Sequence, residues 1–401
     1  MKGKKVIVGV SGGIAAYKAA ELVRLLVRVE AHTRVAMTLN ATRFVCPVTF
    51  EALSGNRVMW DMWEGKGTPM DHITWGQESD LIIIAPATAN LIAKMAHGIG
   101  DDFLSTMLLA ATAQVLVCPS MNNKMFENAI VQENLKLLRQ RGLTVMEPLE
   151  GQLACGTEGL GRLPEPEDIM ELAWILISPQ DLAGLRILVT AGATVEPIDP
   201  VRYISNRSTG KMGYALAKAA RRRGGSVTLV TGPSTLKPPY GVNLCRIKTA
   251  EEMKEAVFER RPECDVIIKA AAVSDYRPKG YTNQKIKKVK DSFSLELVQN
   301  PDILAELGST RNASHCLLVG FAAETEGLLA NAKKKLTSKN LDMIVANDVS
   351  RTDAGFEADT NLVKLIYGDG QVEDLPLMTK DDVAHLILDR LKTMWEERFE
   401  T

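Results

Sequence analysis

The first half of the chain alternates short apolar runs with amphipathic stretches. The runs lie at 4–10, 34–39, 81–87, 115–119 and 143–146. Between them apolar residues recur at helical spacing, as in the series Ala19, Leu22, Leu26 and Val29. Short runs that are apolar throughout are typical of parallel strands with helices on both faces. The pattern therefore predicts a doubly wound parallel sheet.

The second half repeats this plan. Further strands are predicted at 185–191, 226–232, 265–272, 316–322 and 342–348. Residues 361–378 place a Gly-Asp-Gly turn between two alternating runs, which favours a hairpin at the edge of the second sheet. A terminal helix is predicted over about 380–399. The fold class is thus α/β with two successive doubly wound domains.

A boundary is predicted between the two halves. The stretch PEPEDIMELAWILISPQDLAG reads as a capped helix followed by a polar segment. We expect a first domain over 1–178, a linker over 179–185 and a second domain over 186–401. A chain of 401 residues is long enough for two domains that each bury a core.

Composition narrows the class of protein. The chain has 48 Lys and Arg against 49 Asp and Glu, so we expect no nucleic-acid or membrane partner. Six cysteines stand apart without a C-x-x-C pair, which is typical of reduced thiols. We found no signal-peptide pattern and no apolar run of membrane-spanning length. These features predict a soluble cytoplasmic protein.

A glycine turn follows the first predicted strand. Ser11, Gly12 and Gly13 separate that strand from a helix, and backbone N–H groups in such a place can hold a phosphate. The turn is neither G-x-G-x-x-G nor a Walker-type loop. A tight turn without a ligand is therefore the alternative interpretation.

Polar residues follow other strands of the first half. Thr38, Asn40, Thr88 and Asn122 come just after predicted strands, where ligands of open α/β sheets bind. They could add donors for the phosphate, or in the case of Asn122 for a substrate carboxylate or amide. The alternative is helix capping, the usual role of Thr and Asn at these positions.

Two further residues are candidates for proton transfer. His72 lies in a polar stretch beside Asp71, and an imidazole titrates near neutral pH, so it is a candidate general base. Cys155 lies in a glycine-rich polar stretch that suits a mobile flap with a reactive thiol. A structural histidine is the alternative for His72. We expect the other cysteines in apolar contexts to be packing residues: Cys46, Cys118, Cys245 and Cys316.

Several long motifs resemble a known pair of enzyme families. SGGIAAYK, APATANLIAKMAHGIGDD, PSMNNKMF and ACGTEGLGRLPEP resemble the flavin-dependent cysteine decarboxylases, in particular phosphopantothenoylcysteine decarboxylases. SNRSTGKMG, KAAAVSDYRP, KIKK and KNLDMIVAND resemble phosphopantothenate–cysteine ligases. The order is similar to that of the bifunctional family of coenzyme A biosynthesis. Phe126 departs from the tryptophan of many relatives, and we expect it to alter packing only.

The first resemblance implies a flavin mechanism. FMN would oxidise the cysteine thiol so that CO₂ can leave, since simple acid–base groups offer no electron sink. The resemblance makes His72 the base, Asn122 the carboxylate anchor and Cys155 the proton donor for the final reduction. It implies FMN contacts from Ser11, Gly12, Gly13, Thr38, Asn40 and Thr88.

The second resemblance implies CTP-dependent ligation. CTP and Mg²⁺ would activate 4'-phosphopantothenate as an acyl-cytidylate held by Asn206, before L-cysteine attacks. Asp275 is a candidate metal ligand. The implied CTP contacts are Lys269, Ala270, Ala271, Asp275, Lys285, Pro301, Asp302, Ile303, Leu304, Phe321, Lys335 and Lys339. The residues themselves add that Lys335 and Lys339 share a helix face, whereas KIKK alone could be a solvated basic strand.

The resemblance also implies a homododecamer, built from trimeric decarboxylase contacts and dimeric ligase contacts.

Two other functions are compatible with the fold. A nicotinamide oxidoreductase would need a G-x-G-x-x-G turn and an acidic residue after the second strand, which we do not find. A flavin-binding regulatory subunit would not need both His72 and Cys155. A flavin absorbance spectrum and an assay of CO₂ release would separate these alternatives.

Overall fold

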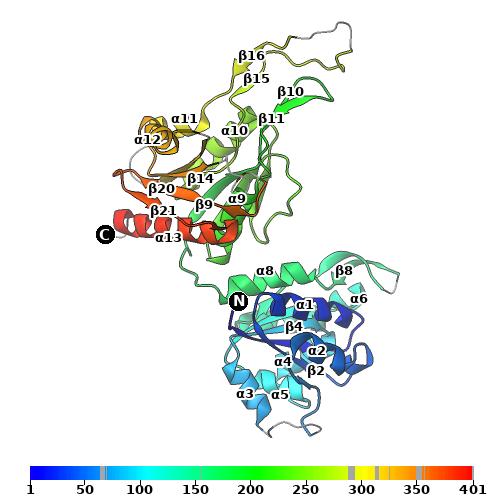
Figure 1. Ribbon diagram of the computed structural model, residues 1–401. Helices are drawn as coiled ribbons and strands as arrows, with labels where there is room; N and C mark the ends of the chain where they lie inside the picture. Colours follow the sequence, from blue (N-terminus) through cyan, green and yellow to red (C-terminus); the bar gives the residue numbers. More distant parts are fainter. Residues whose placement is uncertain are drawn as a thin grey trace. The chain divides into compact units, whose positions relative to one another are not determined.

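Two sheets, one in each half of the chain, organise the fold (Figure 1). The computed structural model describes residues 1–63, 68, 70–154, 156–287, 294–311, 316–324, 326–348, 355 and 357–399. The chain divides into two compact units, Met1–Ser178 and Pro179–Thr401.

The first unit contains a six-stranded parallel sheet in the order β3-β2-β1-β4-β5-β6. Its strands are β1 (Lys5–Val10), β2 (His32–Met37), β3 (Val58–Met59), β4 (Leu81–Ala87), β5 (Gln114–Pro119) and β6 (Thr144–Val145). Apart from the two-residue β3, the order is the 2-1-3-4-5 of flavodoxin-like sheets. The order in which the parallel strands are added to the sheet reverses between β1 and β4. Ligands of open α/β sheets bind at such a point, so a ligand is expected here.

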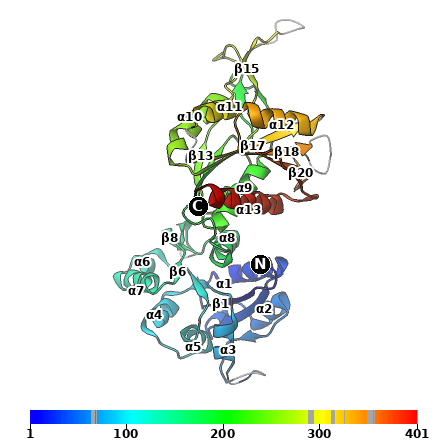
Figure 2. The same cartoon turned by 90° about the vertical axis from the view of Figure 1, so that its left-hand side faces the viewer.

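Helices cover both faces of the first sheet (Figure 2). α1 (Ala16–Arg28) packs on α2 (Pro47–Ser54) and on α8 (Pro166–Ile177), while α4 (Ala89–His97) packs on α5 (Phe103–Leu109) and on α7 (Ala129–Gln140). The remaining elements are η1 (Ala41–Arg43), α3 (Asp71–Glu78), α6 (Asn123–Phe126) and the hairpin of β7 (Leu149–Gln152) with β8 (Glu158–Arg162).

The second unit contains an eight-stranded sheet in the order β13-β12-β9-β14-β17-β18-β20-β21. The first six are parallel: β13 (Asn243–Arg246), β12 (Ser226–Thr231), β9 (Arg186–Ala191), β14 (Val266–Lys269), β17 (Leu317–Glu324) and β18 (Met343–Asp348). They follow the Rossmann order 3-2-1-4-5-6. The antiparallel pair β20 (Val363–Tyr367) and β21 (Val372–Asp374) confirms the predicted edge hairpin.

The central strands of this sheet are buried on both faces. Ile187 and Val189 pack in one core with α9 (Lys211–Arg222) and α13 (Lys380–Phe399), whereas Leu188 packs in the other. That second core holds α10 (Ala250–Arg260), α11 (Ile303–Thr310) and α12 (Leu328–Ser338). The alternation follows from the two-residue period of a strand. The predicted terminal helix is confirmed by α13.

Three small antiparallel pairs and η2 (Arg261–Glu263) complete the second unit, and the sequence patterns did not predict them. The pairs are β10 (Val195–Pro197) with β11 (Tyr203–Ser205), β15 (Tyr276–Pro278) with β16 (Leu297–Gln299), and β19 (Thr360–Asn361) with β22 (Met378–Thr379). Each strand is only two or three residues long, so its pattern cannot be told from that of a loop.

The segment 179–185 is part of the second unit and not a free linker, which corrects our expectation. Leu182 is 1% exposed in the core beside α9 and α13. The carboxylate of Asp181 lies 2.6 Å from Nη2 of Arg223. A short polar stretch in sequence therefore contains an apolar anchor and an ion pair that fix it to this unit.

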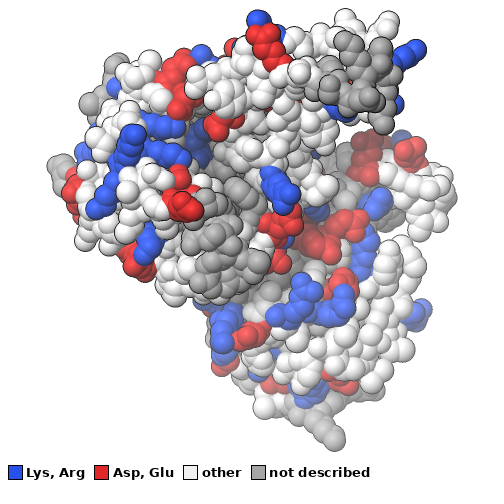
Figure 3. Space-filling view, turned by 45° about the horizontal axis from the view of Figure 1, so that its top comes forward, with Lys and Arg blue, Asp and Glu red and all other residues white. Residues whose placement is uncertain are grey.

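Two surface features complete the description. On the face shown in Figure 3, Lys and Arg side chains lie among Asp and Glu side chains, in line with the balanced composition.

Cys46 is exposed just before α2, so our assignment of it as a packing residue was wrong, whereas Cys118 is buried. No helix in the described part of the chain has the length and apolar character needed to cross a membrane.

Candidate functional site

A cleft of about 570 Å³ opens at the carboxyl ends of β1, β4 and β5. Predicted residues Gly12, Gly13, Thr88 and Asn122 line it. Cavities of this size hold small-molecule ligands and cofactors. The remaining lining residues are Ile14, Ala15, Tyr17, Lys18, Ala89, Ser120, Met121, Met125, Gln152, Leu153, Ala154, Gly161, Arg162 and Leu163.

Ser11 joins the ends of β1 and β4. Its buried hydroxyl donates to the carbonyl oxygen of Pro86 at 2.7 Å and accepts from the N–H of Thr88 at 2.9 Å. The hydroxyl is thereby used in shaping the turn. Gly12 and Gly13 line the cleft with their backbone, since neither has a side chain.

Asn40 packs directly on the turn. A Cβ on Gly12 would stand 2.5 Å from the Cβ of Asn40, so the two backbones approach closely. Thr38 accepts a hydrogen bond from the N–H of Ala41 at 3.3 Å. The structure thus brings Asn40 to the turn, while Thr38 and Asn40 are not among the described residues that line the cleft.

Of the four residues for which helix capping was the alternative, Asn122 caps a helix through its side chain, whereas Asn40 and Thr88 make no side-chain capping bond. Oδ1 of Asn122 accepts from the N–H of Lys124 at 2.8 Å and caps α6. Thr88 precedes α4 without a side-chain capping bond. Asn122 combines the cap with a place at the cleft, so capping does not exclude a role in binding.

The two candidates for proton transfer have different outcomes. His72 is half-buried on α3 and is not among the described residues that line the cleft. Cys155 lies outside the described residues. The hairpin around it is anchored, because the N–H of Met121 donates to the carbonyl oxygen of Gly161 at 3.1 Å. Nδ2 of Asn123 also donates to the carbonyl oxygen of Glu158 at 3.4 Å.

Sequence reasoning missed two cations at the cleft. Nζ of Lys18 lies 2.9 Å from Oε2 of Glu165, and Nη2 of Arg162 lies 2.9 Å from Oε1 of the same residue. The hydrogen bond to Lys18 holds the pKa of Glu165 below its ordinary value, against the opposing effect of burial. The signal in the sequence was that both lie in motifs quoted for the family resemblance, Lys18 in SGGIAAYK and Arg162 in ACGTEGLGRLPEP.

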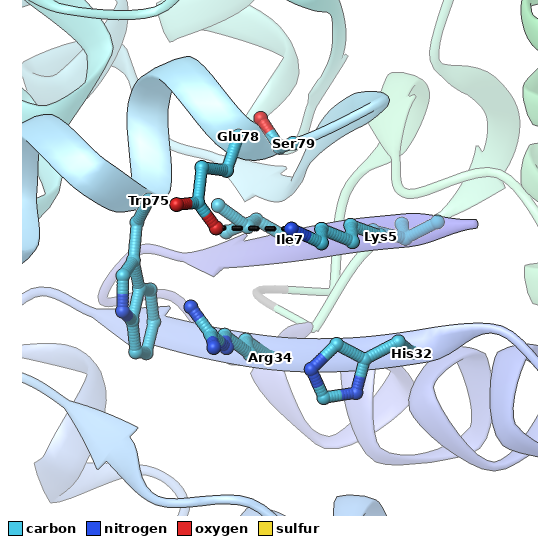
Figure 4. Close-up of a pocket in the computed structure, with 8 residues that line it drawn as sticks. Lys5, Ile7, His32, Arg34, Trp75, Glu78 and Ser79 are labelled. Atoms are coloured by element: carbon cyan, nitrogen blue, oxygen red, sulfur yellow. Dashed lines mark hydrogen bonds and ion pairs between the residues drawn. The ribbon is translucent and has the colours of Figure 1, made fainter. Parts of the chain in front are cut away.

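A much smaller cavity lies at the opposite, amino-terminal end of β1 (Figure 4). Nζ of Lys5 is 2.9 Å from Oε2 of Glu78, and the guanidinium of Arg34 lies 5.1 Å from the ring centre of Trp75. The volume of about 10 Å³ leaves room for little more than one water molecule. These residues lie at the amino-terminal end of the sheet, away from the cleft.

In the second unit three predicted residues form a charged cluster. Nζ of Lys339, after α12, lies 2.7 Å from Oδ2 of Asp302, which caps α11. Lys269 ends β14 and is 6% exposed, with Nζ 3.5 Å from Sδ of Met253. Burial lowers the pKa of Lys269 to about 7; Asp302 raises it and Lys339 lowers it. The cluster joins strand and helix ends distant in sequence.

Other predicted residues surround this cluster. Ala270 and Ala271 directly follow Lys269, and the N–H of Ala271 donates to Oγ1 of Thr190 at 3.1 Å. Pro301 precedes Asp302, while Ile303 and Leu304 begin α11. Phe321 lies in β17, and Nζ of Lys335 pairs with Glu324 of the same strand at 2.6 Å.

Three predicted residues are exposed. Asn206 follows β11, Asp275 precedes β15, and Lys285 lies beside Ile286, whose N–H donates to Oδ2 of Asp199 at 3.2 Å. No contact recorded within the described ranges joins Lys285 to the cluster of Lys269, Asp302 and Lys339. Lys288 of the KIKK motif lies outside the described residues.

In the described part of the second unit, buried polar atoms without hydrogen-bond partners also lie near the carboxyl ends of strands. Among the described residues, Oγ of Ser274 and Oδ1 of Asn347 are buried and accept or donate no hydrogen bond. Such atoms are rare and are satisfied by a ligand or water in many proteins. In the described part of the chain no group of three or more His, Cys, Asp or Glu side chains is arranged to hold a metal ion.

Comparison with known proteins identifies the same two halves. The family described as Flavoprotein matches residues 1–177. The family described as DNA/pantothenate metabolism flavoprotein C-terminal domain matches residues 182–394. A crystal structure of the C-terminal domain of the coenzyme A biosynthesis bifunctional protein CoaBC is 44% identical, covering 54% of this chain and 99% of its own, with a TM-score of 0.47.

Full-length relatives extend over both halves. The coenzyme A biosynthesis bifunctional protein CoaBC of Bacillus subtilis is 46% identical, over 98% of each chain. The protein of that name from Escherichia coli K12 is 44% identical, over 99% of each chain. The chain therefore belongs to the CoaBC family of bifunctional coenzyme A biosynthesis enzymes, which unite a decarboxylase and a ligase.

Proposed function

We propose that the second unit joins 4'-phosphopantothenate to L-cysteine with CTP, and that the first unit decarboxylates the product, 4'-phosphopantothenoylcysteine, with FMN. Both reactions would take place in the cytoplasm. The observation that carries the proposal is the cleft at the reversal point of the first sheet, where Gly12, Gly13, Thr88 and Asn122 meet. The sequence alone predicts each of these residues as a candidate.

The residues at this cleft fit a mononucleotide. The Gly12–Gly13 turn presents backbone to the cleft, and it precedes the amino end of α1. Backbone N–H groups there would bind the phosphate of FMN, supported by Thr38, Asn40 and Thr88. Bound FMN would supply the electron sink that loss of CO₂ from an acyl-cysteine requires.

The protein groups would position the substrate and move its protons. Asn122 would bind the substrate carboxylate through its amide, while its Oδ1 keeps the α6 cap. Cys155 would deliver a proton at the end of the reaction. Since His72 does not line the cleft of its own chain, a second copy would supply it as the base, which agrees with the proposed homododecamer of decarboxylase trimers and ligase dimers.

The charged cluster of the second unit supports nucleotide binding. Lys269 and Lys339 would provide positive charge for CTP, and Asp302 holds Lys339 in place at 2.7 Å. The unpaired Oγ of Ser274 and Oδ1 of Asn347 suit a polar ligand at this edge. Asn206 would hold the acyl-cytidylate while the amine of cysteine attacks.

The proposed role of Mg²⁺ depends mainly on the nucleotide. Magnesium keeps several waters and binds through one or two carboxylates together with substrate phosphates. A protein cage of three acidic groups is therefore unnecessary, and Asp275 is the proposed single carboxylate. Lys285 would contribute to CTP from its exposed segment beside Asp199, supplied to the cluster by a second copy of the ligase unit.

One assay tests the complete proposal. The purified chain is given 4'-phosphopantothenate, L-cysteine, CTP and Mg²⁺, and the products are identified by mass. The expected products are 4'-phosphopantetheine, CO₂, CMP and pyrophosphate, from protein with a flavin absorbance spectrum. A protein without flavin that releases no CO₂ from added 4'-phosphopantothenoylcysteine would contradict the decarboxylase assignment.

A further inference from the structure

The cleft of the first unit carries charge of one sign only. Lys18, in the first turn of α1, and Arg162, at the end of β8, are the charged residues among those described as lining it. All other lining residues are uncharged. A cleft with this lining favours an anionic ligand at the place where the two cations meet.

The two cations converge on one carboxylate. Lys18 and Arg162 each lie 2.9 Å from a different oxygen of Glu165, and Nζ of Lys18 also lies 3.4 Å from the carbonyl oxygen of Leu163. Glu165 itself is not among the residues found to line the cleft. The three side chains together keep one positive charge, so they do not neutralise each other.

The arrangement has the properties of a prepared anion site. The side chain of Lys18 is only 16% exposed, so its position is fixed by the protein. Both donors reach a single carboxylate, so they lie close enough together to bind one compact anion. A phosphate monoester carries more charge than a carboxylate and offers three acceptor oxygens, and Arg binds it through a planar fork.

We propose that Lys18 and Arg162 bind the phosphate monoester of the acyl-cysteine substrate, with Glu165 holding the two cations in place. This inference rests on the proposed function and specifies which part of the substrate the cleft recognises. The cofactor phosphate has the same chemistry. The substrate is favoured because Arg162 belongs to the β7–β8 hairpin, whereas the Gly12–Gly13 turn follows β1 and offers its own N–H groups.

The test compares two substrates on full-length protein. Decarboxylation of 4'-phosphopantothenoylcysteine and of pantothenoylcysteine is measured for wild type, Lys18→Met and Arg162→Met. Wild type should prefer the phosphorylated substrate. Each variant should raise KM for that substrate by about 10- to 100-fold, the effect of a lost charge-assisted hydrogen bond. KM for the substrate without phosphate and the flavin content should not change.

Lys5, at the start of the strand that precedes α1, provides a matched control for Lys18. Lys5 pairs with Glu78 at 2.9 Å at the other end of β1, away from the cleft (Figure 4). Lys5→Met should leave both KM values unchanged. Lys18→Arg, which keeps the charge, should recover part of the preference for the phosphorylated substrate.

The outcomes separate this inference from the proposed function. Equal effects on both substrates, or a wild type indifferent to the phosphate, would overturn the inference and leave the decarboxylase assignment intact. Loss of flavin in Lys18→Met would assign the cations to the cofactor and also overturn it. If wild type releases no CO₂ from either substrate, the proposed function fails. Calorimetric binding of 4'-phosphopantetheine against pantetheine then still tests Lys18 and Arg162.

Discussion

Gly12 lies so close to Asn40 that a Cβ on residue 12 would stand 2.5 Å from the Cβ of Asn40 and 2.8 Å from its carbonyl carbon. Contacts this short do not occur between real atoms of these kinds, so a side chain here must displace the backbone. Gly13, the next residue, has its nearest such atom, Cγ2 of Thr88, at 3.4 Å. A side chain at residue 12 would therefore clash with Asn40, whereas a Cβ at residue 13 would make only an ordinary contact with Thr88.

We predict that Gly12→Ala strongly lowers flavin content because the turn must move away from Asn40. The overpacking should also lower the free energy of unfolding of the first unit by about 1–3 kcal/mol. Flavin content is measured by absorbance and stability by urea unfolding. Gly13→Ala is the matched control and should have the smaller effect on stability. Equal stability losses in the two variants would contradict the steric argument.

We predict that Lys269 makes the stability of the second unit depend on pH. Burial lowers its pKa in the folded chain to about 7, from 10.5, with Asp302 raising it and Lys339 lowering it. Between these values the unfolded chain binds a proton that the folded chain does not, so the free energy of unfolding rises with pH. Below about pH 7 Lys269 is protonated in both states, so it no longer makes the free energy of unfolding depend on pH.

The measurement compares wild type with Lys269→Met by urea unfolding between about pH 7 and 9. The difference in unfolding free energy between the two proteins should change with pH. Lys364→Met is the control, since Lys364 is paired with Asp374 at 2.6 Å nearer the surface, and its curve should parallel wild type. Parallel curves for Lys269→Met as well would show that Lys269 is charged in the folded chain.

We predict that Arg223→Met destabilises the second unit by about 1–3 kcal/mol. Arg223 is 6% exposed and lies 2.6 Å from Asp181 and 2.7 Å from Asp389, so its loss removes an ion-pair partner from each of two carboxylates. Thermal unfolding of the full chain measures the effect. Arg24→Met, which breaks an exposed pair with Glu21, should cause no measurable change. A stable Arg223→Met protein would argue against 179–185 as part of this unit.

We predict that Asn206→Asp separates the two half-reactions of the ligase. Aspartate keeps the size of asparagine but loses the amide donor and adds a negative charge, which would disfavour a bound acyl-cytidylate. CTP-dependent pyrophosphate release should remain in part, whereas ligation to cysteine should be abolished. Both are measured on the same preparation, with Asn243→Asp on exposed β13 as control. Equal loss of both activities would argue against a role limited to the intermediate.

The apolar runs determined most strands of both sheets, although none of them predicted β3 or β13. The run at 81–87 is β4 residue for residue, and the terminal helix over 380–399 is α13. Buried strands and amphipathic helices depend on local period, which a single sequence displays. The glycine turn was also local, because a strand, a turn and a helix follow each other directly in the chain.

The tertiary structure alone decided which distant residues meet. Lys18 and Glu165 are 147 positions apart, and no local pattern marks them as partners. In the sequence Lys269 is a lysine at the end of a predicted strand, and only the fold shows that its amine is buried against Met253. Leu182 stood in a polar stretch and became part of a core. Which residues are buried and which form pairs depends on the surfaces that the folded sheet brings together. The hydrophobic periodicity that forms the strands and helices is local, and the sequence alone displays it.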